Sequence, residues 1–318
     1  MKFDAIILAA GRGKRMKPFS DIISKPMLPI LNKPLVSLIA EQLLRLGAQN
    51  IVITVSKSNE KEIKNYFEKQ LYKEKITFCI QDPPMGTADA IYKAALLTEE
   101  ETIISMSGDN LFSENFTNTM LKEFFNSDEE ISCVMALKKV TKEEITKLAS
   151  VKVDEKGLIQ SIVEKPELED VESTLASLSA YVLSKKVIKF FGTVPLSPRG
   201  EYEAPDAFLA MLASSLKIKL QGSVTREPYL HISNPIDLWN FNIQYLGDKE
   251  NEISTNAIIQ DQVTLKKSII GPNVTIGTNS TLEECLVLEG VKIPSNTNLK
   301  HAVIGRSEKG FETVIIPE

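Results

Sequence analysis

The chain has 318 residues, of which 43% are hydrophobic and 25% are charged, and its formal net charge is −5. These values are typical of a soluble globular chain, and the negative net charge argues against a general nucleic-acid binder. The longest apolar runs are far too short to span a membrane. The length allows one large domain and a smaller one. Because the first residues enter a predicted strand without a signal-peptide pattern, we expect a cytoplasmic protein.

The first predicted element is a buried strand over residues 3–8, followed by a loop with two glycines, Gly11 and Gly13. The loop also carries basic residues: Arg12, Lys14, Arg15, Lys17 and Lys25. Glycine leaves backbone N–H groups accessible, and several cations beside them suit a polyphosphate. The loop lacks the third glycine of a dinucleotide fingerprint and the Gly-Lys-Ser/Thr of a P-loop, so a plain turn with solvated basic residues is the alternative.

Strand-like and helix-like segments then alternate. Predicted strands cover residues 51–55, 76–80 and 102–106, and predicted helices cover residues 34–46, 60–71 and 87–97. This alternation predicts an α/β fold with a doubly wound, mixed but mostly parallel sheet of the Rossmann-like kind. Three candidate motifs, around Gly11, Gln81 and Asp109, follow strand ends, which is the edge where such sheets bind ligands.

The second half is less regular. Strands are predicted at residues 131–137, 149–153, 158–164, 181–183 and 217–220, and helices at 185–191, 204–214 and 235–246. From about residue 251 a six-residue period appears, at Ile258, Thr264, Ile270, Ile276, Leu282 and Leu288. This period predicts a short left-handed parallel β-helix of about three coils over residues 251–318, after a first domain of residues 1–250. An array of β-hairpins is the alternative.

Four sequence motifs resemble those of the sugar-1-phosphate nucleotidyltransferases, also called nucleoside diphosphate-sugar pyrophosphorylases. They are L-A-A-G-x-G-x-R-M-x-P with the following K-P-M-L-P-I-x-x-K-P-L, Q-x-x-x-x-G-T-A-x-A at residues 81–90, Gly108-Asp109, and Glu164-Lys165-Pro166. The resemblance covers roughly residues 1–250, and members of this family often carry a C-terminal β-helix. It implies transfer of a nucleotidyl group from an NTP to a sugar-1-phosphate, with Mg²⁺ as cofactor and pyrophosphate as the second product.

The resemblance implies a role for each matched residue. The residues expected to bind the nucleotide are Leu8, Ala10, Gly11, Gly13, Gln81, Gly86 and Thr87. The catalytic residues are Arg15 on the β,γ-phosphates, Lys25 on the α-phosphate and the incoming sugar phosphate, and Asp109 on the Mg²⁺. The sugar phosphate is expected to contact Glu164, Lys165 and Glu201.

The amide of Gln81 suggests which base is bound. It offers a donor beside an acceptor, and the imide edge of uracil or thymine offers the complementary pair. We therefore favour UTP or dTTP, with glucose-1-phosphate or N-acetylglucosamine-1-phosphate as the acceptor. The same segment also resembles ADP-glucose pyrophosphorylases, so a purine nucleotide stays open.

Two segments depart from the family pattern. His231 stands where a second metal-binding Asp is expected, and imidazole is a poorer partner for Mg²⁺ than a carboxylate. It is therefore either a second metal ligand or a bystander. Ser177 and Ser179 stand where an Asn and a Gly are expected in N-A-G-x-Y, which leaves the sugar specificity open.

Other functions stay open beside the enzyme. A catalytically weak regulatory or scaffold subunit is favoured by His231, and an acyltransferase in the β-helix would have to use His301. We expect an NTP and a sugar-1-phosphate as ligands, a homo-oligomer, and no nucleic-acid or membrane partner. Two histidines exclude a multi-histidine metal site, and three cysteines without metal-ligand spacing predict buried free thiols at Cys79, Cys133 and Cys285.

Overall fold

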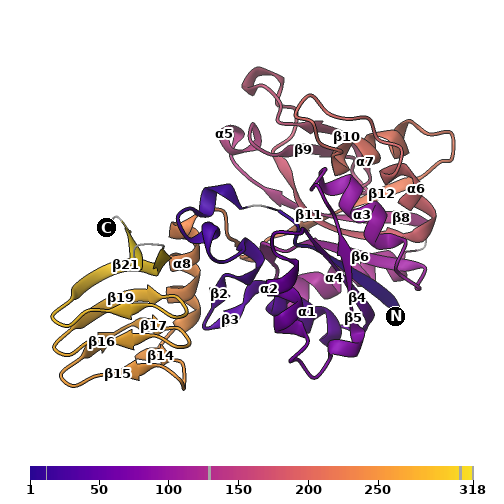
Figure 1. Cartoon of the computed structure of the whole chain (residues 1–318). Coiled ribbons are helices and arrows are strands. Elements are labelled where there is room, and N and C mark those ends of the chain that lie inside the picture. Colours follow the sequence, from indigo (N-terminus) through magenta and orange to yellow (C-terminus); the bar gives the residue numbers. More distant parts are fainter. Residues whose placement is uncertain (12, 128–129, 308–309, 317–318) are drawn as a thin grey trace. The chain divides into compact units, whose positions relative to one another are not determined.

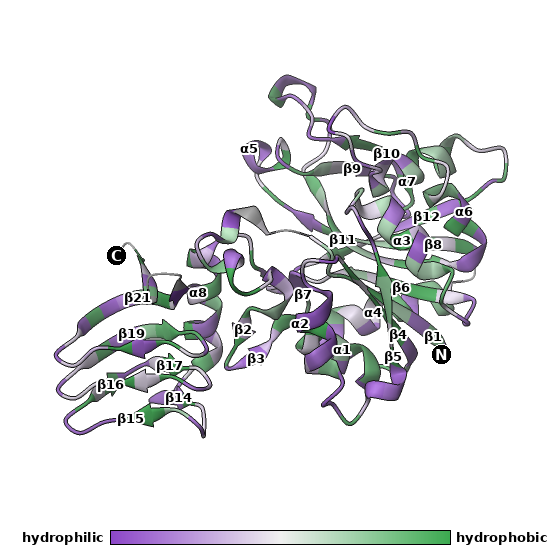
Figure 2. Ribbon diagram, in the orientation of Figure 1, coloured by the Kyte–Doolittle hydropathy of each residue, from purple (hydrophilic) through white to green (hydrophobic). Residues whose placement is uncertain are grey.

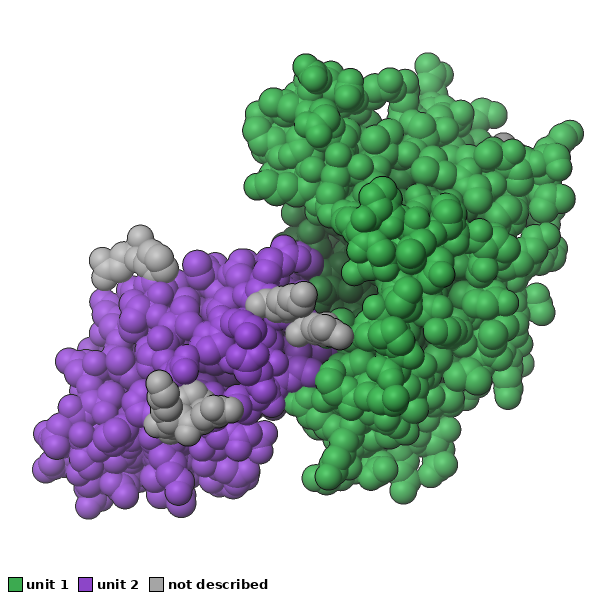
Figure 3. Space-filling view, turned by 45° about the horizontal axis from the view of Figure 1, so that its top comes forward, with its two compact units in different colours: residues 1–11, 39–229 green, residues 12–38, 230–318 purple. Residues whose placement is uncertain are grey.

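The computed structural model of the chain describes residues 1–11, 13–127, 130–307 and 310–316. Packing divides it into two compact units, each assembled from two stretches of sequence (Figure 3). Unit 1 comprises residues 1–11 and 39–229, and unit 2 comprises residues 12–38 and 230–318. The predicted division into residues 1–250 and 251–318 is not the same as the division into these two units, and it stays a prediction. Arg12 lies outside the described residues.

Unit 1 is built on a nine-stranded sheet, in the order β5-β4-β1-β6-β11-β8-β12, with β9 also paired to β11 and β10 paired to β9 (Figure 1). Its strands are β1 (Phe3–Leu8), β4 (Ala48–Val55), β5 (Ile76–Ile80), β6 (Thr102–Ser107), β8 (Ile131–Lys139), β9 (Ala149–Val153), β10 (Ile159–Glu164), β11 (Leu175–Ser184) and β12 (Lys219–Thr225). The strands β5, β4, β1 and β6 are parallel, and β11 is antiparallel to β6 and β8. The predicted doubly wound, mixed sheet is confirmed.

Helices pack against the sheet, whose central strands are mostly hydrophobic (Figure 2). The helices of unit 1 are α1 (Leu35–Arg45, which begins in the sequence of unit 2), α2 (Glu60–Phe67), α3 (Thr87–Ala95), α4 (Glu114–Phe125), α5 (Lys142–Ile145), α6 (Ile188–Phe191) and α7 (Ala204–Ala213), and its 3-10 turns are η4 (Lys73–Lys75), η5 (Leu168–Asp170) and η6 (Lys185–Val187). Five of six residues are buried in both β1 and β6. Continuous burial of this kind is typical of parallel strands covered on both faces.

Several element bounds differ from the sequence predictions. The helix predicted over residues 60–71 ends at Phe67, whose ring packs edge-on against Tyr72 and Phe78. The strand predicted at residues 181–183 is the end of the ten-residue β11, whose earlier serines hide the strand pattern. Helix α4 was not predicted, although Ser113 caps it by accepting a hydrogen bond from the Phe116 N–H at 3.0 Å.

In unit 2, helix α8 (Pro235–Leu246) has the predicted bounds and packs beside a small hairpin. The hairpin consists of β2 (Pro29–Ile30) and β3 (Lys33–Pro34), and the same stretch forms the 3-10 turns η1 (Lys14–Met16), η2 (Phe19–Asp21) and η3 (Lys25–Met27). Asn242 of α8 donates to the Pro29 carbonyl and accepts from the Leu31 N–H, both at 2.9 Å. Trp239 of α8 donates to the Glu284 carbonyl at 2.6 Å, so the helix is joined to the C-terminal strands.

The C-terminal strands form the predicted parallel β-helix of about three coils. They are β14 (Asn251–Ile253), β15 (Ile258–Ile259), β16 (Thr264–Lys266), β17 (Ser268–Ile270), β18 (Thr275–Ile276), β19 (Thr281–Val287), β20 (Lys292–Ile293) and β21 (Asn298–Ser307), closed by the antiparallel β22 (Gly310–Ile315). Partners in successive coils are 17 residues apart, as in Thr264 with Thr281 and Thr281 with Asn298. Each coil is therefore one residue shorter than three hexapeptides.

This shorter coil corrects the predicted six-residue period. The inward positions are spaced by six, six and five residues, and they include Ile270, Ile276, Leu282, Val287 and Ile293. Ile258 and Thr264 are consequently exposed, and Leu288 falls one position beyond the inward Val287. A strict period of six holds only over the middle of the segment, because one side of every coil has five residues.

The corners of the β-helix place ordinary side chains in the left-handed backbone region. Two sets of stacked corners are Gln262, Asn279 and Asn296, and Lys267, Glu284 and His301, all with φ between +47° and +61°. Asparagine tolerates this conformation better than most residues. Asn279 also donates to the Asn296 side chain at 2.7 Å, which links neighbouring coils. His301 pairs with Glu284 at 3.0 Å in the other set.

Other predictions can be checked directly. Cys79, Cys133 and Cys285 are buried and free, as predicted, and burial raises the pKa of the Cys285 thiol to about 11. Within the described ranges, no helix combines the length and the apolar character that a bilayer crossing requires.

Glu123 of α4 should make the stability of the protein pH-dependent. Burial raises the pKa of this carboxyl more than its hydrogen bond with Ser223 lowers it, and its Oε2 atom has no partner among the described residues. The folded state therefore holds the proton more tightly, so the free energy of unfolding falls as the pH rises above the unfolded pKa of about 4.3. We expect Glu123→Gln to raise this free energy by about 1 kcal/mol at pH 7.

Urea unfolding at pH 4 and pH 7 checks this expectation. At pH 4 the gain should vanish, because the carboxyl is then protonated in the folded state. Glu130→Gln, at an exposed carboxylate, is the control. A gain of the same size at both pH values would contradict the assignment.

Candidate nucleotide and sugar-phosphate site

The end of β1 is fixed firmly within unit 1. The Ala9 N–H donates to both oxygens of Thr54, at 3.1 Å to the carbonyl and 3.0 Å to the hydroxyl. The Ala9 carbonyl accepts from the side chain of Asn59 at 2.8 Å. Leu8 is half-buried, Ala10 is buried and Gly11 is exposed, so the chain leaves a rigid strand just before the predicted phosphate loop. Asn59 was not predicted from the sequence.

The rest of the predicted loop belongs to unit 2. Gly13 has φ +60°, and a Cβ there would lie 2.8 Å from the Cβ of Lys25. Glycine at this position therefore makes room for the stem of Lys25, which is half-buried at the start of η3. Arg15 lies exposed in η1, and His231 lies half-buried in the two-residue strand β13 (Leu230–His231).

Gln81 follows β5 in unit 1 and is almost fully buried. Its amide nitrogen donates to the Gly86 carbonyl at 2.9 Å and to Asp89 at 2.8 Å, and Lys93 also pairs with Asp89 at 3.0 Å. Both N–H donors of the amide are therefore used inside the unit, so the predicted donation from Gln81 to a base carbonyl is wrong for this arrangement. Its carbonyl oxygen is the atom that can accept from a base N–H, and such an N–H is part of the imide edge of uracil and thymine.

A change of Gln81 to glutamate tests this arrangement. It would place a second carboxylate against Asp89 and remove both donors, so we expect a loss of about 2 kcal/mol in the free energy of unfolding at pH 7. Adding Asp89→Asn should recover more than half of that loss, because an amide can donate to the new carboxylate. Denaturant unfolding of the single and double variants measures the coupling. Equal losses in both would contradict the contact.

The segment after Gln81 is joined by backbone hydrogen bonds to the loop that carries Glu201. The Tyr202 N–H donates to the Met85 carbonyl at 2.7 Å, and the Ala88 N–H donates to the Tyr202 carbonyl at 2.9 Å. The Thr87 hydroxyl accepts from the Ala204 N–H at 3.0 Å. Unit 1 thus brings the predicted base segment and one predicted sugar residue together.

Asp109 follows β6 and is held beside the end of β1. The preceding Gly108 donates its N–H to the Leu8 carbonyl at 2.8 Å, and a Cβ on Gly108 would lie 2.8 Å from that same oxygen. The Ser107 hydroxyl donates to the Asp109 carboxylate at 2.5 Å. The pKa of the Tyr229 hydroxyl is raised, first by burial and second by the negative charge of Asp109. Tyr229 is therefore close enough to this carboxylate to interact with it electrostatically.

The predicted sugar residues at the end of β10 are tied to an arginine that the sequence analysis missed. Arg199 forms ion pairs with Glu164, at 3.1 Å, and with Glu203. Lys165 lies 3.8 Å from Glu164 and has φ +49°. Burial raises the pKa of Glu203, but hydrogen bonds from Arg199 and Ser197 outweigh it, so the pKa is lowered. The signal available in the sequence was Arg199 directly before Gly200-Glu201.

The serine segment of β11 explains one departure from the family pattern. Ser179 has φ +53°, and the pairing of β11 with β8 shifts register between Ser177 and Tyr181. A residue with left-handed backbone at a bulge is a position where glycine costs less than any residue with a Cβ. We expect Ser179→Gly to stabilise the protein by about 1 kcal/mol, measured by urea unfolding. Ser177→Gly, at the neighbouring serine, should destabilise it instead.

Comparison with known proteins identifies relatives over most of the chain. A family model described as "Nucleotidyl transferase" matches residues 4–229, and one described as "GlmU-like, C-terminal hexapeptide" matches residues 247–316. A protein of Methanocaldococcus jannaschii named "Putative UTP--glucose-1-phosphate uridylyltransferase" is 30% identical over 235 residues, which cover 65% of this chain and 81% of the relative. The bifunctional protein GlmU of the same organism is 26% identical over 272 residues, covering 84% of this chain but only 61% of that relative.

Solved structures agree on the fold. A UDP-glucose pyrophosphorylase complexed with UDP-glucose superposes with a TM-score of 0.68 at 21% sequence identity, covering 78% of this chain and all of that one. Within the described residues, no group of three or more His, Cys, Asp or Glu side chains lies close enough together to hold a metal ion by itself.

Proposed function

Because the chain belongs to the nucleotidyl transferase family, we propose that it transfers a nucleotidyl group from UTP or dTTP to a sugar-1-phosphate and releases pyrophosphate. One relative carries the name "Putative UTP--glucose-1-phosphate uridylyltransferase", and this name supports a pyrimidine nucleotide and a hexose-1-phosphate acceptor. The single observation that carries the proposal is the linkage in unit 1 between the Gln81–Gly86 segment and the loop of Glu201.

In the proposed reaction a phosphate oxygen of the sugar attacks the α-phosphorus of the NTP. The bond from that phosphorus to the bridging oxygen of pyrophosphate breaks, and the negative charge leaves with pyrophosphate. Such a transfer needs little covalent help, so the protein contributes positioning and charge neutralisation. Arg15 and Lys25 are the proposed cationic contacts for the phosphates, and the carbonyl of Gln81 accepts from the base.

Glu201 and the Glu164–Lys165 pair are the proposed contacts of the sugar phosphate. The ion pair of Arg199 with Glu164, at 3.1 Å, supports this proposal because it restrains the carboxylate.

Mg²⁺ is the proposed cofactor. The chemistry of Asp109 fits it, because magnesium in nucleotide sites is held by one or two carboxylates together with substrate phosphates, and Asp109 is a strand-end carboxylate. When bound, the ion supplies charge neutralisation on the transferring phosphoryl group. Whether His231 supports a second metal stays a prediction, as does assembly into a homo-oligomer.

Pyrophosphate release tests the proposal. Purified protein is incubated with Mg²⁺, each NTP in turn, and glucose-1-phosphate or N-acetylglucosamine-1-phosphate. Release with UTP or dTTP that stops on chelation supports the proposed reaction. Release with a purine NTP alone would keep the transferase and overturn the pyrimidine assignment of Gln81. Nucleotide binding without turnover for any pair would favour the regulatory subunit, and His231→Asp is then the variant to assay.

A further inference from the structure

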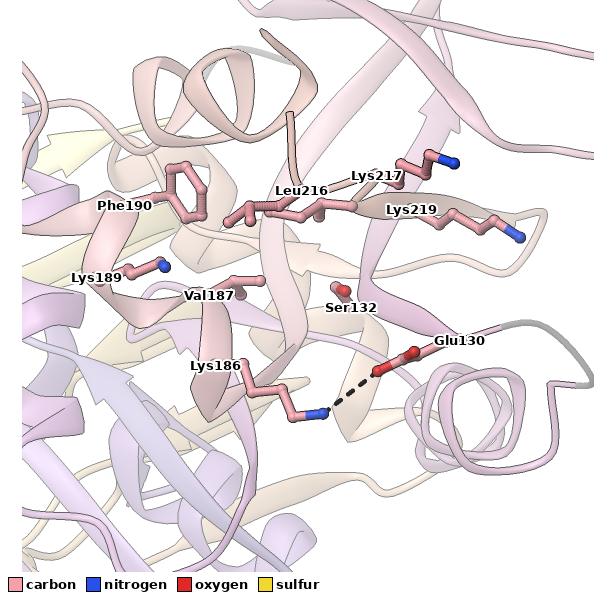
Figure 4. Close-up of a pocket in the computed structure, with 10 residues that line it drawn as sticks. Glu130, Ser132, Lys186, Val187, Lys189, Phe190, Leu216, Lys217 and Lys219 are labelled. Carbon is pink, nitrogen blue, oxygen red and sulfur yellow. Dashed lines mark hydrogen bonds and ion pairs between the residues drawn. The ribbon is translucent and has the colours of Figure 1, made fainter. Parts of the chain in front are cut away.

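A lysine-lined pocket of unit 1 lies at the sheet edge opposite Asp109. It has a volume of about 360 Å³ and forms where β8 and β12 begin, beside η6 and α6 (Figure 4). Strand β11 is antiparallel to both β6 and β8, so β8 runs parallel to β6, and β12 runs parallel to β8. The pocket therefore lies at the edge where β6 starts, whereas Asp109 follows the end of β6.

The charged residues around this pocket are mostly cationic. Its lining includes the carboxylate of Glu130 and four lysines, which are Lys186, Lys189, Lys217 and Lys219. Lys186 pairs with Glu130 at 3.3 Å, but their side chains are 75% and 86% exposed, so this pair is weak. The formal charges of these five lining side chains sum to +3, in a chain whose net charge is −5. A local concentration of this sign attracts an anion.

The same pocket has an apolar wall. Val187 is buried beneath it, Phe190 is half-buried, and Leu216 is 57% exposed although it lies beside the lysines. The ammonium of Lys189 lies 5.7 Å from the centre of the Phe190 ring. Figure 4 shows Lys186 and Lys189 on the η6–α6 side and Lys217 and Lys219 on the β12 side, with Ser132 between them. An apolar wall with a few convergent polar groups is typical of a small-molecule site.

We infer that this pocket binds a small organic phosphate. The phosphate lies among the lysines and the Ser132 hydroxyl, because ammonium groups and hydroxyls are suitable donors to phosphate oxygens. The ring or apolar part of the ligand covers Phe190 and Leu216. The volume fits a molecule of this size and is far below what a folded partner needs. None of the lining residues takes part in the proposed transfer, so the inference stands independently of it.

Calorimetric titration of the full-length protein with phenyl phosphate tests the inference. Lys217→Glu with Lys219→Glu should weaken binding at least tenfold. Lys61→Glu with Lys69→Glu makes the same charge change at exposed positions in and just beyond α2 and should leave binding within twofold. Arg15→Ala with Lys25→Ala should also leave it within twofold, which separates this pocket from the proposed substrate site.

A second variant tests the apolar wall. Leu216→Gln should weaken phenyl phosphate severalfold and leave inorganic phosphate unchanged, and it keeps the test informative where the charge-reversed variant folds poorly. An equal loss of phenyl phosphate binding in the Lys217/Lys219 variant and the Lys61/Lys69 variant would mean that the ligand is attracted only by the general charge of the protein, and it would overturn the inference. Loss confined to the Arg15 and Lys25 variant would place the ligand in the substrate site. Binding of a hexaglutamate peptide without binding of phenyl phosphate would overturn the small-molecule class.

Discussion

Replacing Gly86 with alanine is expected to lower kcat/KM for pyrophosphate release at least 100-fold and to destabilise unit 1 by about 3 kcal/mol. Gly86 has φ +112° and ψ 175°, a combination that is essentially restricted to glycine. A Cβ there would also lie 2.8 Å from the Tyr202 nitrogen, within the pair of hydrogen bonds that joins the two loops. Those loops would have to separate, and a displacement of about 1 Å in a substrate-positioning segment costs roughly 100-fold in rate.

Gly200→Ala is the matched control for this variant. Gly200 has φ +77° in the same region of unit 1, but a Cβ there would meet nothing within 4 Å. We expect a loss of about 1 kcal/mol from backbone strain alone and a change in kcat/KM within about threefold. Steady-state kinetics and thermal unfolding of both variants separate the effect of contact from the effect of strain. Similar losses of activity in the two would contradict the proposed role of the loop linkage.

Replacing Asp109 with asparagine is expected to lower kcat about 1,000-fold while the fold is retained. The amide keeps the size of the side chain but removes the negative charge that we propose holds Mg²⁺, and loss of one strong electrostatic contact typically costs 100- to 1,000-fold. The Mg²⁺ concentration needed for half-maximal activity should rise in parallel. Circular dichroism and thermal unfolding confirm that the protein is folded.

Ser107→Ala, at the hydrogen-bond partner of Asp109, is the comparison variant, and it should lower kcat less than Asp109→Asn does. It removes the hydroxyl that donates to the carboxylate at 2.5 Å and leaves the charge in place. We expect at most a tenfold loss of kcat and a smaller shift in the Mg²⁺ requirement. Asp154→Asn, at a carboxylate that caps a hairpin on another part of the sheet, should leave both quantities unchanged. A Ser107→Ala loss as large as that of Asp109→Asn would contradict a direct metal role for Asp109.

The sequence predicted the sheet well where local pattern and burial coincide. Strands β1 and β6 are buried along most of their length and carry short runs of strand-forming apolar residues, which mark them in the sequence, and the candidate motifs after β1, β5 and β6 follow from the chain order. Strand β11 was predicted only in part, because its serines sit at a bulge whose shape depends on pairing with β8. The bulge is a tertiary feature with no local pattern.

The candidate site was predictable as a set of motifs but not as a set of contacts. Family resemblance led to Gln81, but only the fold shows that its amide donors are already occupied by Gly86 and Asp89. Arg199 was not predicted from the sequence, because Glu164 is far from it along the chain and Glu203 belongs to no recognisable motif. A residue that acts by pairing across loops leaves no periodic signal, so it becomes visible only when the loops are placed in space.

The 17-residue register of the β-helix limits how this part of the chain can change in length during evolution. Adding one hexapeptide would move every later residue to the next side of the coil, so the stacked asparagines would no longer align and the five-residue side would be out of step with the coils before it. Duplicating or deleting a whole turn of 17 residues keeps every side and corner in step and changes the height of the stack by one strand spacing, about 4.8 Å. Relatives with taller stacks are therefore expected to differ from this chain by complete turns rather than by single hexapeptides.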